Sequence, residues 1–201
     1  MRLAIFSDIH GNWDALEKVL VDMDRNRIDS RVCLGDSVGY GPEPEEVIRE
    51  IRTLGIPMVM GNHELGLVDP STLDWFNKPT RTSLRITRRL LSKESLNYLK
   101  GLNPFLLDHD CRFVHGFPPD SITTYLYEVP DPEIHRILTA LPERICFIGH
   151  THDLHLIASE GPGIIYLPFK RGVFSLREGV KYLVNVGSVG QPRDGTTRPS
   201  M

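Results

Sequence analysis

The sequence has no long apolar run, few cysteines and little excess charge of either sign. No stretch approaches the roughly 18 apolar residues of a membrane-spanning helix, and the apolar run near the N-terminus is too short for a secretory signal. The three cysteines lie far apart without CxxC spacing, which indicates buried, reduced thiols in a cytoplasmic protein. With a formal net charge of -3, neither nucleic acid nor a membrane is expected as an obligate partner.

The first half of the chain alternates strand-like and helical segments. A length of 201 residues suits a single domain, which we expect to span residues 1–201. Apolar runs at 2–6, 31–34 and 56–60 predict buried strands, separated by amphipathic helices that begin after Asn12 and near Pro44. Residues 70–101 are predicted to be helical in two or three short pieces, the last of which begins at Ser92 and ends at Gly101. This alternation is typical of a mainly parallel sheet covered by helices.

After Gly101 the pattern changes to short strands. Two are expected around a turn at 108–110, followed by a helix near 132–140 and a buried strand at 146–149. From His155 onward, short β runs separated by glycines indicate an antiparallel edge. These patterns are compatible with a four-layer sandwich and with a two-layer α/β fold that has an antiparallel flank.

Side chains of metal-binding type follow five of the predicted strands. The strand sequences LAIF, VCL, PMVM, RFV and CFI lead directly into SDIHGN, GDSVG, GNHE, HG and GHTH. Because sites in open α/β sheets form at the carboxyl edge of the strands, these segments are expected to converge. The expected cluster is Asp8, His10, Asp36, Asn62, His63, His115, His150 and His152.

The size of this cluster indicates two metals rather than one. A single DxH, HxH or GD is common by chance, and one histidine at a strand end is usually a hydrogen-bonded structural residue. The ordered set of five segments is what favours a metal site. Leaving His63 aside, the donors outnumber what one metal that keeps water can use, so two metals sharing a ligand fit better. Imidazole with oxygen donors suits manganese, iron, zinc, nickel or cobalt.

Taken in order, DIH, GD, GNHE, HG and GHTH resemble the calcineurin-like metallophosphoesterases, and GDSVGYGP and VGSVGQPRDG resemble a small prokaryotic phosphodiesterase-like branch. The resemblance implies an α/β fold, a four-layer α/β/β/α sandwich of mixed sheets flanked by helices. It also implies a phosphodiesterase or phosphatase for small phosphorylated molecules. Two divalent transition metals would serve as cofactors, with manganese the first candidate.

The resemblance also implies a role for each member of the cluster. One metal would be bound by Asp8, His10 and His152, the other by Asn62, His115 and His150, with Asp36 bridging them. Two such cations hold a bridging hydroxide that attacks phosphorus and neutralise the charge of the transition state. His63 would be the proton donor, or a phosphate contact, near the leaving group.

The sequence departs from the family pattern at two places. Many relatives read GDxxD, where the second acid holds the histidine that corresponds to His63, but here that position is Gly39. Relatives of this branch also continue with further strands after PRDG, whereas this sequence stops at Met201. What orients His63, and whether a partner in a homo-oligomer supplies a sheet edge, are left open.

Several residues near the motifs have two interpretations. Asn12 and Arg193 are predicted to contact substrate, although helix capping also explains Asn12 and an ion pair with Asp194 also explains Arg193. Tyr40 could stack on a base or serve packing alone.

Other functions share the same core. Protein phosphatases and dinucleoside polyphosphate hydrolases are the alternative enzymes, and a scaffold on the same fold is the alternative without catalysis. Because a scaffold should have lost several ligands and all seven are present, the sequence predicts an enzyme.

Overall fold

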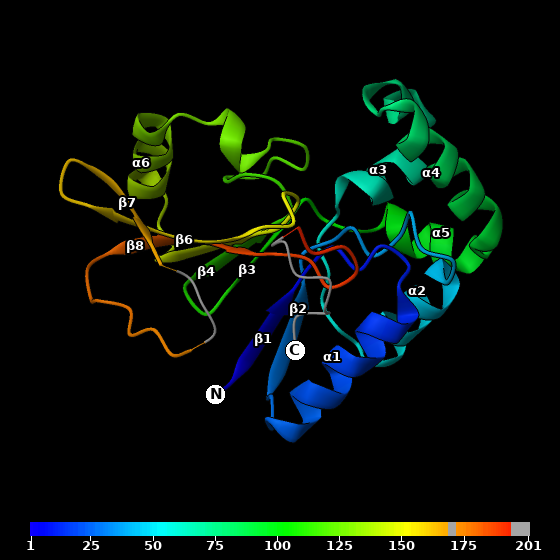
Figure 1. The fold of residues 1–201 in the computed structure, drawn as a ribbon, viewed down its shortest axis with the longest axis horizontal. Helices are drawn as coiled ribbons and strands as arrows, with labels where there is room; N and C mark the ends of the chain where they lie inside the picture. Colours follow the sequence, from blue (N-terminus) through cyan, green and yellow to red (C-terminus); the bar gives the residue numbers. More distant parts are fainter. Residues whose placement is uncertain (169–171, 194–201) are drawn as a thin grey trace.

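The computed structural model describes residues 1–168 and 172–193 and places two β-sheets between two groups of helices (Figure 1). A small parallel sheet pairs β1 (Leu3–Phe6) with β2 (Ser30–Cys33). A larger mixed sheet has six strands in the order β3-β4-β5-β8-β6-β7. The predicted α/β fold with mixed sheets flanked by helices is confirmed.

Helices of the first half pack beside the small sheet. They are α1 (Trp13–Arg25), α2 (Pro44–Thr53), α3 (Asn62–Val68), α4 (Lys78–Leu90) and α5 (Lys93–Lys100), with a 3-10 helix, η1, at Pro70–Trp75. As predicted, Asn12 caps α1 by accepting a hydrogen bond from the Ala15 amide at 3.1 Å, and Ser92 caps α5 in the same way. The helical prediction for 70–101 is confirmed.

The predicted third strand at 56–60 is wrong. This segment forms only isolated bridges, Cys33 with Met58 and Val59 with Asn103, so the small sheet has two strands among the described residues. Pro57 contributes a carbonyl to the Cys33 amide but has no N–H of its own, and the chain bends at Gly61 into α3. A regular ladder with β2 therefore cannot extend in either direction.

The second half of the chain builds the larger sheet. Its strands are β3 (Phe105–Asp108), β4 (Cys111–Val114), β5 (Ile145–Ile148), β6 (Leu154–Glu160), β7 (Gly163–Leu167) and β8 (Lys181–Val186). Two helices accompany them, the 3-10 helix η2 (Leu126–Glu128) and α6 (Asp131–Ala140). The last strand, β8, inserts between β5 and β6, parallel to the first and antiparallel to the second. The predicted antiparallel edge is confirmed by β6 and β7.

Apolar side chains fill the spaces between the layers. Val32 and Leu34 meet Phe113 between the two sheets, and Ile134 and Leu138 of α6 pack on the opposite face of the larger sheet. Cys33, Cys111 and Cys146 are buried free thiols within these layers, as predicted. In the described ranges no helix is both long and apolar enough to cross a membrane.

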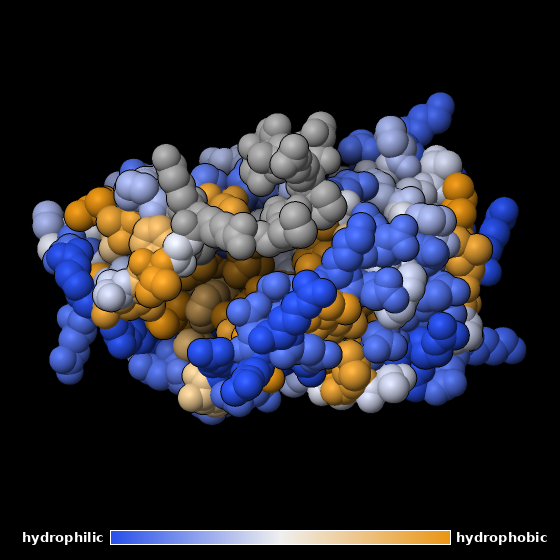
Figure 2. Space-filling view, turned by 60° about the horizontal axis from the view of Figure 1, so that its bottom comes forward, coloured by the Kyte–Doolittle hydropathy of each residue, from blue (hydrophilic) through white to orange (hydrophobic). Residues whose placement is uncertain are grey.

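The larger sheet is wider than the small one. Part of its inner face is therefore covered by another segment of the chain and not by the small sheet. There, Leu156, Tyr182 and Val184 form a cluster against Leu176, in the segment that precedes β8. Figure 2, which brings the underside of Figure 1 forward, shows apolar side chains around a hollow in its left half.

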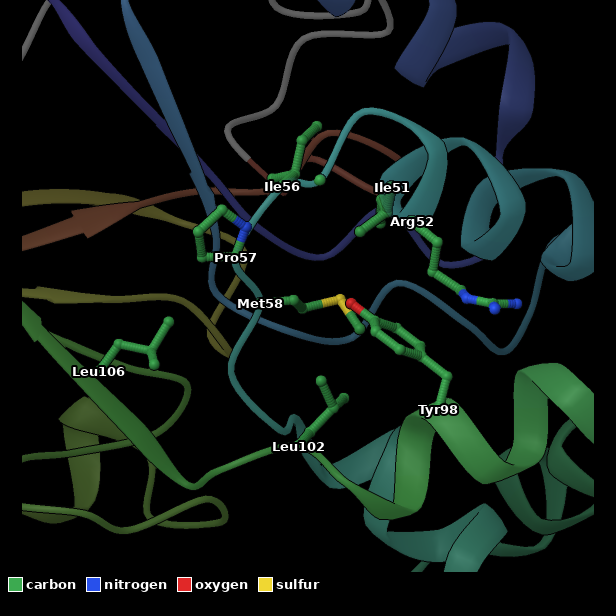
Figure 3. Close-up of a pocket in the computed structure, with 9 residues that line it drawn as sticks. Ile51, Arg52, Ile56, Pro57, Met58, Tyr98, Leu102 and Leu106 are labelled. Atoms are coloured by element: carbon green, nitrogen blue, oxygen red, sulfur yellow. The ribbon is translucent and has the colours of Figure 1, made fainter.

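A separate cavity of about 420 Å³ lies between α2, α5 and β3 (Figure 3). It is lined by Ile51, Arg52, Gly55, Ile56, Pro57, Met58, Tyr98, Leu102 and Leu106. This lining is mostly apolar and includes none of the predicted metal-binding residues, so the cavity is not the candidate active site.

Candidate metal centre

The five predicted segments meet at one place in the fold. In Figure 1 the loops that follow β1, β2, β4 and β5 come together near the centre, between the larger sheet and helices α1–α5. All eight residues of the predicted cluster are buried there, none more than 8% exposed: Asp8, His10, Asp36, Asn62, His63, His115, His150 and His152. The two sheets thus bring together side chains from most of the length of the chain.

One group of donors consists of Asp8, His10 and His152. The Nε2 atoms of His10 and His152 are 3.0 Å apart, and Asp8 Oδ1 lies 3.2 Å from His152 Nε2 and 3.7 Å from His10 Nε2. Two atoms that each bind one ion at about 2.1 Å and at right angles lie about 3 Å apart. These three side chains can therefore bind a common ion with little movement.

A second group consists of Asn62, His115 and His150. His115 Nε2 lies 3.0 Å from Asn62 Oδ1 and 3.2 Å from His150 Nδ1. Asp36 lies between the two groups, since its Oδ2 is 3.4 Å from His115 Nε2 and 3.9 Å from His10 Nε2. A single carboxylate oxygen is thus within reach of ions bound to either group.

Each of the four histidines in the two donor groups has one ring nitrogen that faces the cluster and one that makes a hydrogen bond to a backbone carbonyl. The pairs are His10 with Val38, His115 with Leu34, His150 with Thr123 and His152 with Gln191, at distances from 2.8 to 3.2 Å. A carbonyl only accepts, so the nitrogen facing it carries the proton in a neutral ring and the opposite nitrogen directs a lone pair into the cluster. Metal-binding histidines are commonly oriented in this way.

The converging lone pairs indicate a cation. Asp8 Oδ1 is buried and has no hydrogen-bond partner anywhere in the described structure, although acceptor nitrogens of two histidines surround it. Facing acceptors repel one another unless positive charge lies between them. A divalent cation fits this donor set of carboxylates, an amide oxygen and neutral imidazoles.

The ionisation of the cluster supports the same conclusion. Burial strongly favours neutral imidazoles and lowers the pKa of His10 and of His150 to about 3. Burial also acts to lower the pKa of His115, but the charge of Asp36 and a hydrogen bond to it, together with the charges of Asp8 and Glu64, outweigh burial and raise that pKa to about 9. Conversely, His115 holds the pKa of Asp36 well below its ordinary value despite burial. Negative charge is therefore retained at the centre of the cluster, and positive charge is favoured beside it.

Most of the predicted ligands have a left-handed backbone conformation. The φ angles of Asp8, His10, Asp36, His150 and His152 lie between +50° and +69°. Residues other than glycine rarely adopt such angles, which cost about 1–3 kcal/mol each when the surrounding structure enforces them. Five of the predicted ligands therefore have strained backbone conformations, and these conformations direct their side chains into one site.

Glu64, for which the sequence predicted no role, supports the candidate site. Its buried carboxylate accepts hydrogen bonds from the amides of Asp36, Ser37 and Gly61 at 2.8 to 3.0 Å, and from the Ser37 hydroxyl at 2.7 Å. It thus ties the loop that carries Asp36 to the start of α3, which carries Asn62. The available signal was its position three residues after Gly61, at the first turn of a helix.

The end of β8 and the residues that follow it support the loops of predicted ligands from the other side. Asn185 donates to the Gly149 carbonyl at 3.0 Å and to the Thr151 hydroxyl at 2.7 Å, and the Ser188 hydroxyl donates to the Asp8 carbonyl at 2.8 Å. The segment belongs to the motifs that resemble the family, but the sequence predicted no role for either residue. Both hold loops that carry predicted ligands.

His63 is held by aromatic rings rather than by an acid. Its ring centroid lies 4.6 Å from that of His10, 4.7 Å from that of Tyr40 and 5.8 Å from that of Phe76. Its Nδ1 is buried and finds no hydrogen-bond partner in residues 1–168 and 172–193. A Cβ atom placed on Gly39 would lie only 2.1 Å from this Nδ1. The position that holds the second acid in many relatives is therefore in direct contact with the histidine ring.

Substitution of Gly39 by alanine is expected to displace His63 and to lower kcat about 10- to 100-fold, because small misplacements of a catalytic group have effects of this size. Gly55→Ala is the matched control. Both glycines have positive φ, +88° and +60°, but a Cβ at Gly55 meets no atom within 4 Å. The measurement is steady-state hydrolysis of a phosphoester by both variants. Equal activities of the two variants would contradict this role of Gly39.

The other predicted substrate contacts lie close to the cluster. Asn12 donates from Nδ2 to the Gly190 carbonyl at 3.3 Å in addition to capping α1, so both polar atoms of its amide have partners. The backbone N–H of Arg193 donates to the His152 carbonyl at 3.3 Å, which places this residue beside a predicted ligand. Asp194, its suggested ion-pair partner, lies outside the described residues. Substrate contact by Asn12 and Arg193 remains a prediction.

The fold and the converging donors are those of a phosphoester hydrolase of the metallophosphoesterase class. The sequence model of the calcineurin-like phosphoesterases matches residues 1–154. The chain therefore belongs to the calcineurin-like phosphoesterase family, as its motifs predicted.

Relatives support this assignment. The crystal structure of a metallophosphoesterase from Sphaerobacter thermophilus is 36% identical in sequence, with a TM-score of 0.81 over 99% of this chain and 81% of that one. An uncharacterized protein of Methanocaldococcus jannaschii is 34% identical over 98% of this chain and 80% of its own length. A symmetrical bis(5'-nucleosyl)-tetraphosphatase of Proteus mirabilis is 29% identical, but the match covers 57% of this chain and 43% of that enzyme.

Proposed function

We propose that this protein is a two-metal phosphodiesterase or phosphatase that acts on small phosphorylated molecules. The observation that carries the proposal is the place of Asp36, whose Oδ2 lies 3.4 Å from His115 Nε2 and 3.9 Å from His10 Nε2. A carboxylate shared between two donor groups is suited to hold two cations about 3.5–4 Å apart, the spacing of two-metal hydrolytic sites.

Each of the two donor groups would hold one cation. Asp8, His10 and His152 would hold one divalent cation and Asn62, His115 and His150 the other, with Asp36 shared. Manganese is the first candidate, and iron, zinc, nickel and cobalt suit the same donors. His63 also lies within reach of His10 and Asp36, so its role as a group that does not bind metal is part of the proposal.

The residues of the chain then have separate tasks. When bound, the cations supply a nucleophile at neutral pH and neutralise charge on the phosphoryl group. Hydrogen bonds to backbone carbonyls keep the four histidine donors directed into the site. His63, whose Nε2 lies 3.9 Å from Asp36 Oδ2, would donate a proton to the leaving oxygen.

A dinucleoside polyphosphate hydrolase is the second candidate. The match to symmetrical bis(5'-nucleosyl)-tetraphosphatases, over 57% of this chain for the Proteus mirabilis enzyme, favours it over a protein phosphatase. The metal chemistry would be the same in each case, since only the groups around the reacting phosphate differ. A cytoplasmic location, a single domain over 1–201, possible self-association and independence from nucleic acid and membranes remain predictions.

Metal removal tests the proposed function. Protein stripped with a chelator is expected to lose hydrolysis of chromogenic phosphomonoesters and phosphodiesters, and to regain it with at least one of manganese, iron, zinc, nickel and cobalt. Elemental analysis of the active form should find about two ions per chain. If the stripped protein remains fully active, or if none of the five metals gives activity, the proposal is wrong.

A further inference from the structure

Three rings form a stack that leads from the candidate metal centre to the surface, here called the aromatic ladder: His150, Tyr125 and Tyr127. The Tyr125 ring lies on the His150 ring with 3.7 Å between centroids and 16° between planes. Tyr127 stacks on Tyr125 at 4.9 Å and 17°. Because His150 and Tyr127 are both parallel to Tyr125 and close to it, they occupy its opposite faces.

The ladder is fixed in place by the segment that carries it. The Thr123 carbonyl binds His150 Nε2 at 3.1 Å, and Leu126 is buried in the core. The Tyr125 amide donates to the Glu128 carboxylate at 3.0 Å, which closes the short helix η2. These contacts attach the rings directly to a predicted metal ligand, so their positions are set before any substrate binds.

Tyr127 ends the ladder at the surface. Its side chain is 73% exposed although the ring is held parallel to its neighbour. A flat ring that is both ordered and exposed offers a stacking surface for another aromatic group. Every nucleobase has such a surface, and stacking on aromatic side chains is a common way in which proteins bind bases.

We propose that the aromatic ladder is a base-binding subsite and that the substrate is a nucleoside polyphosphate, in which the base stacks on Tyr127 while a phosphate reacts at the metal centre. This inference rests on the proposed phosphoesterase function and specifies its substrate class. The outer face of Tyr127 is two ring spacings, 4.9 Å and 3.7 Å, away from His150. A chain of several phosphates spans such a separation, whereas a single phosphate next to the ribose holds the base closer.

The charge beside the ladder suits this substrate. Arg193, whose backbone N–H binds the His152 carbonyl at 3.3 Å, lies close enough for its charge to act on the Tyr125 hydroxyl. The guanidinium thus supplies positive charge near the Tyr125 ring, on the side of the site where the linking phosphates would lie under this proposal.

The test compares a nucleoside triphosphate with inorganic tripolyphosphate, which has the phosphates without a base. For Tyr127→Ala in the manganese-loaded protein, the ratio of kcat/KM for the nucleotide to that for tripolyphosphate should fall about 5- to 100-fold, mostly through KM. Tyr127→Phe keeps the ring and should retain the ratio. Tyr166→Ala, at an exposed tyrosine of β7, is the matched control.

Binding provides a readout that does not need turnover. Calorimetric titration with a non-hydrolysable methylene analogue of the nucleotide should show a similar loss of affinity for Tyr127→Ala and little change for Tyr127→Phe. An unchanged ratio in Tyr127→Ala, or equal losses with nucleotide and tripolyphosphate, would overturn the base-binding role. If the wild-type protein hydrolyses chromogenic phosphoesters and Tyr127→Ala gives either result, the ladder alone is refuted, whereas a wild-type protein without activity on any phosphoester refutes the proposed function.

Discussion

Asp36→Asn is expected to lower kcat for phosphoester hydrolysis by about 10³-fold or more. The side chain keeps its size and its carbonyl-type oxygen, so the hydrogen bond from the His63 amide to Oδ1, 2.8 Å in the wild type, can be retained. What is lost is the charge of the oxygen that lies between the two donor groups. The measurement combines steady-state kinetics with elemental analysis, which should show fewer than two ions per chain.

Asp24→Asn is the control for this substitution. It makes the same chemical change on the surface, where the Asp24 side chain is 72% exposed and pairs with Arg31. Wild-type activity is expected, because exposed ion pairs contribute at most about 1 kcal/mol. Circular dichroism of both variants should match the wild type. Full activity of Asp36→Asn would show that this residue does not bridge the two metals.

His63→Ala is expected to lower kcat about 10²- to 10⁴-fold while both metals stay bound, if His63 acts as a general acid. The ring is buried beside Asp36, with its Nε2 3.9 Å from Asp36 Oδ2, and burial lowers its pKa against the opposing charge of that carboxylate. The loss should be larger for an alkyl phosphoester than for a nitrophenyl ester. An alkoxide needs a proton as it leaves, whereas nitrophenolate does not.

The leaving-group comparison separates the possible roles of His63. Equal losses with both esters would indicate a phosphate contact in place of a proton donor. Loss of a metal ion from the variant would instead make His63 a ligand, which its grouping with His10 and Asp36 allows geometrically. His109→Ala, at an exposed turn between β3 and β4, is the matched control and should leave metal content and rates unchanged.

The donor set could be predicted because it depends on short motifs at strand ends. Asp8, Asp36, His115 and His150 each follow a buried strand within a few residues, and strands of one layer end at a common edge. The roles of Glu64 and Tyr127 could not be predicted in the same way. Glu64 accepts hydrogen bonds from backbone amides of a loop 27 or more residues earlier in the chain. Tyr127 reaches the site only because its ring belongs to a stack that ends on His150.

By itself, the sequence determined the order of most helices and strands, the caps at Asn12 and Ser92, and the side chains that gather in the candidate metal centre. These features depend on local patterns of burial, capping and turn formation, which act over a few residues. The tertiary structure decided the rest. The 56–60 segment forms only isolated bridges to Cys33 and Asn103 and so does not become a strand. Tertiary contacts also insert β8 between β5 and β6 and bring Gly39 against the His63 ring. Such contacts depend on how the two sheets stack, and His10 meets His152 across 142 positions of the chain only because of that stacking.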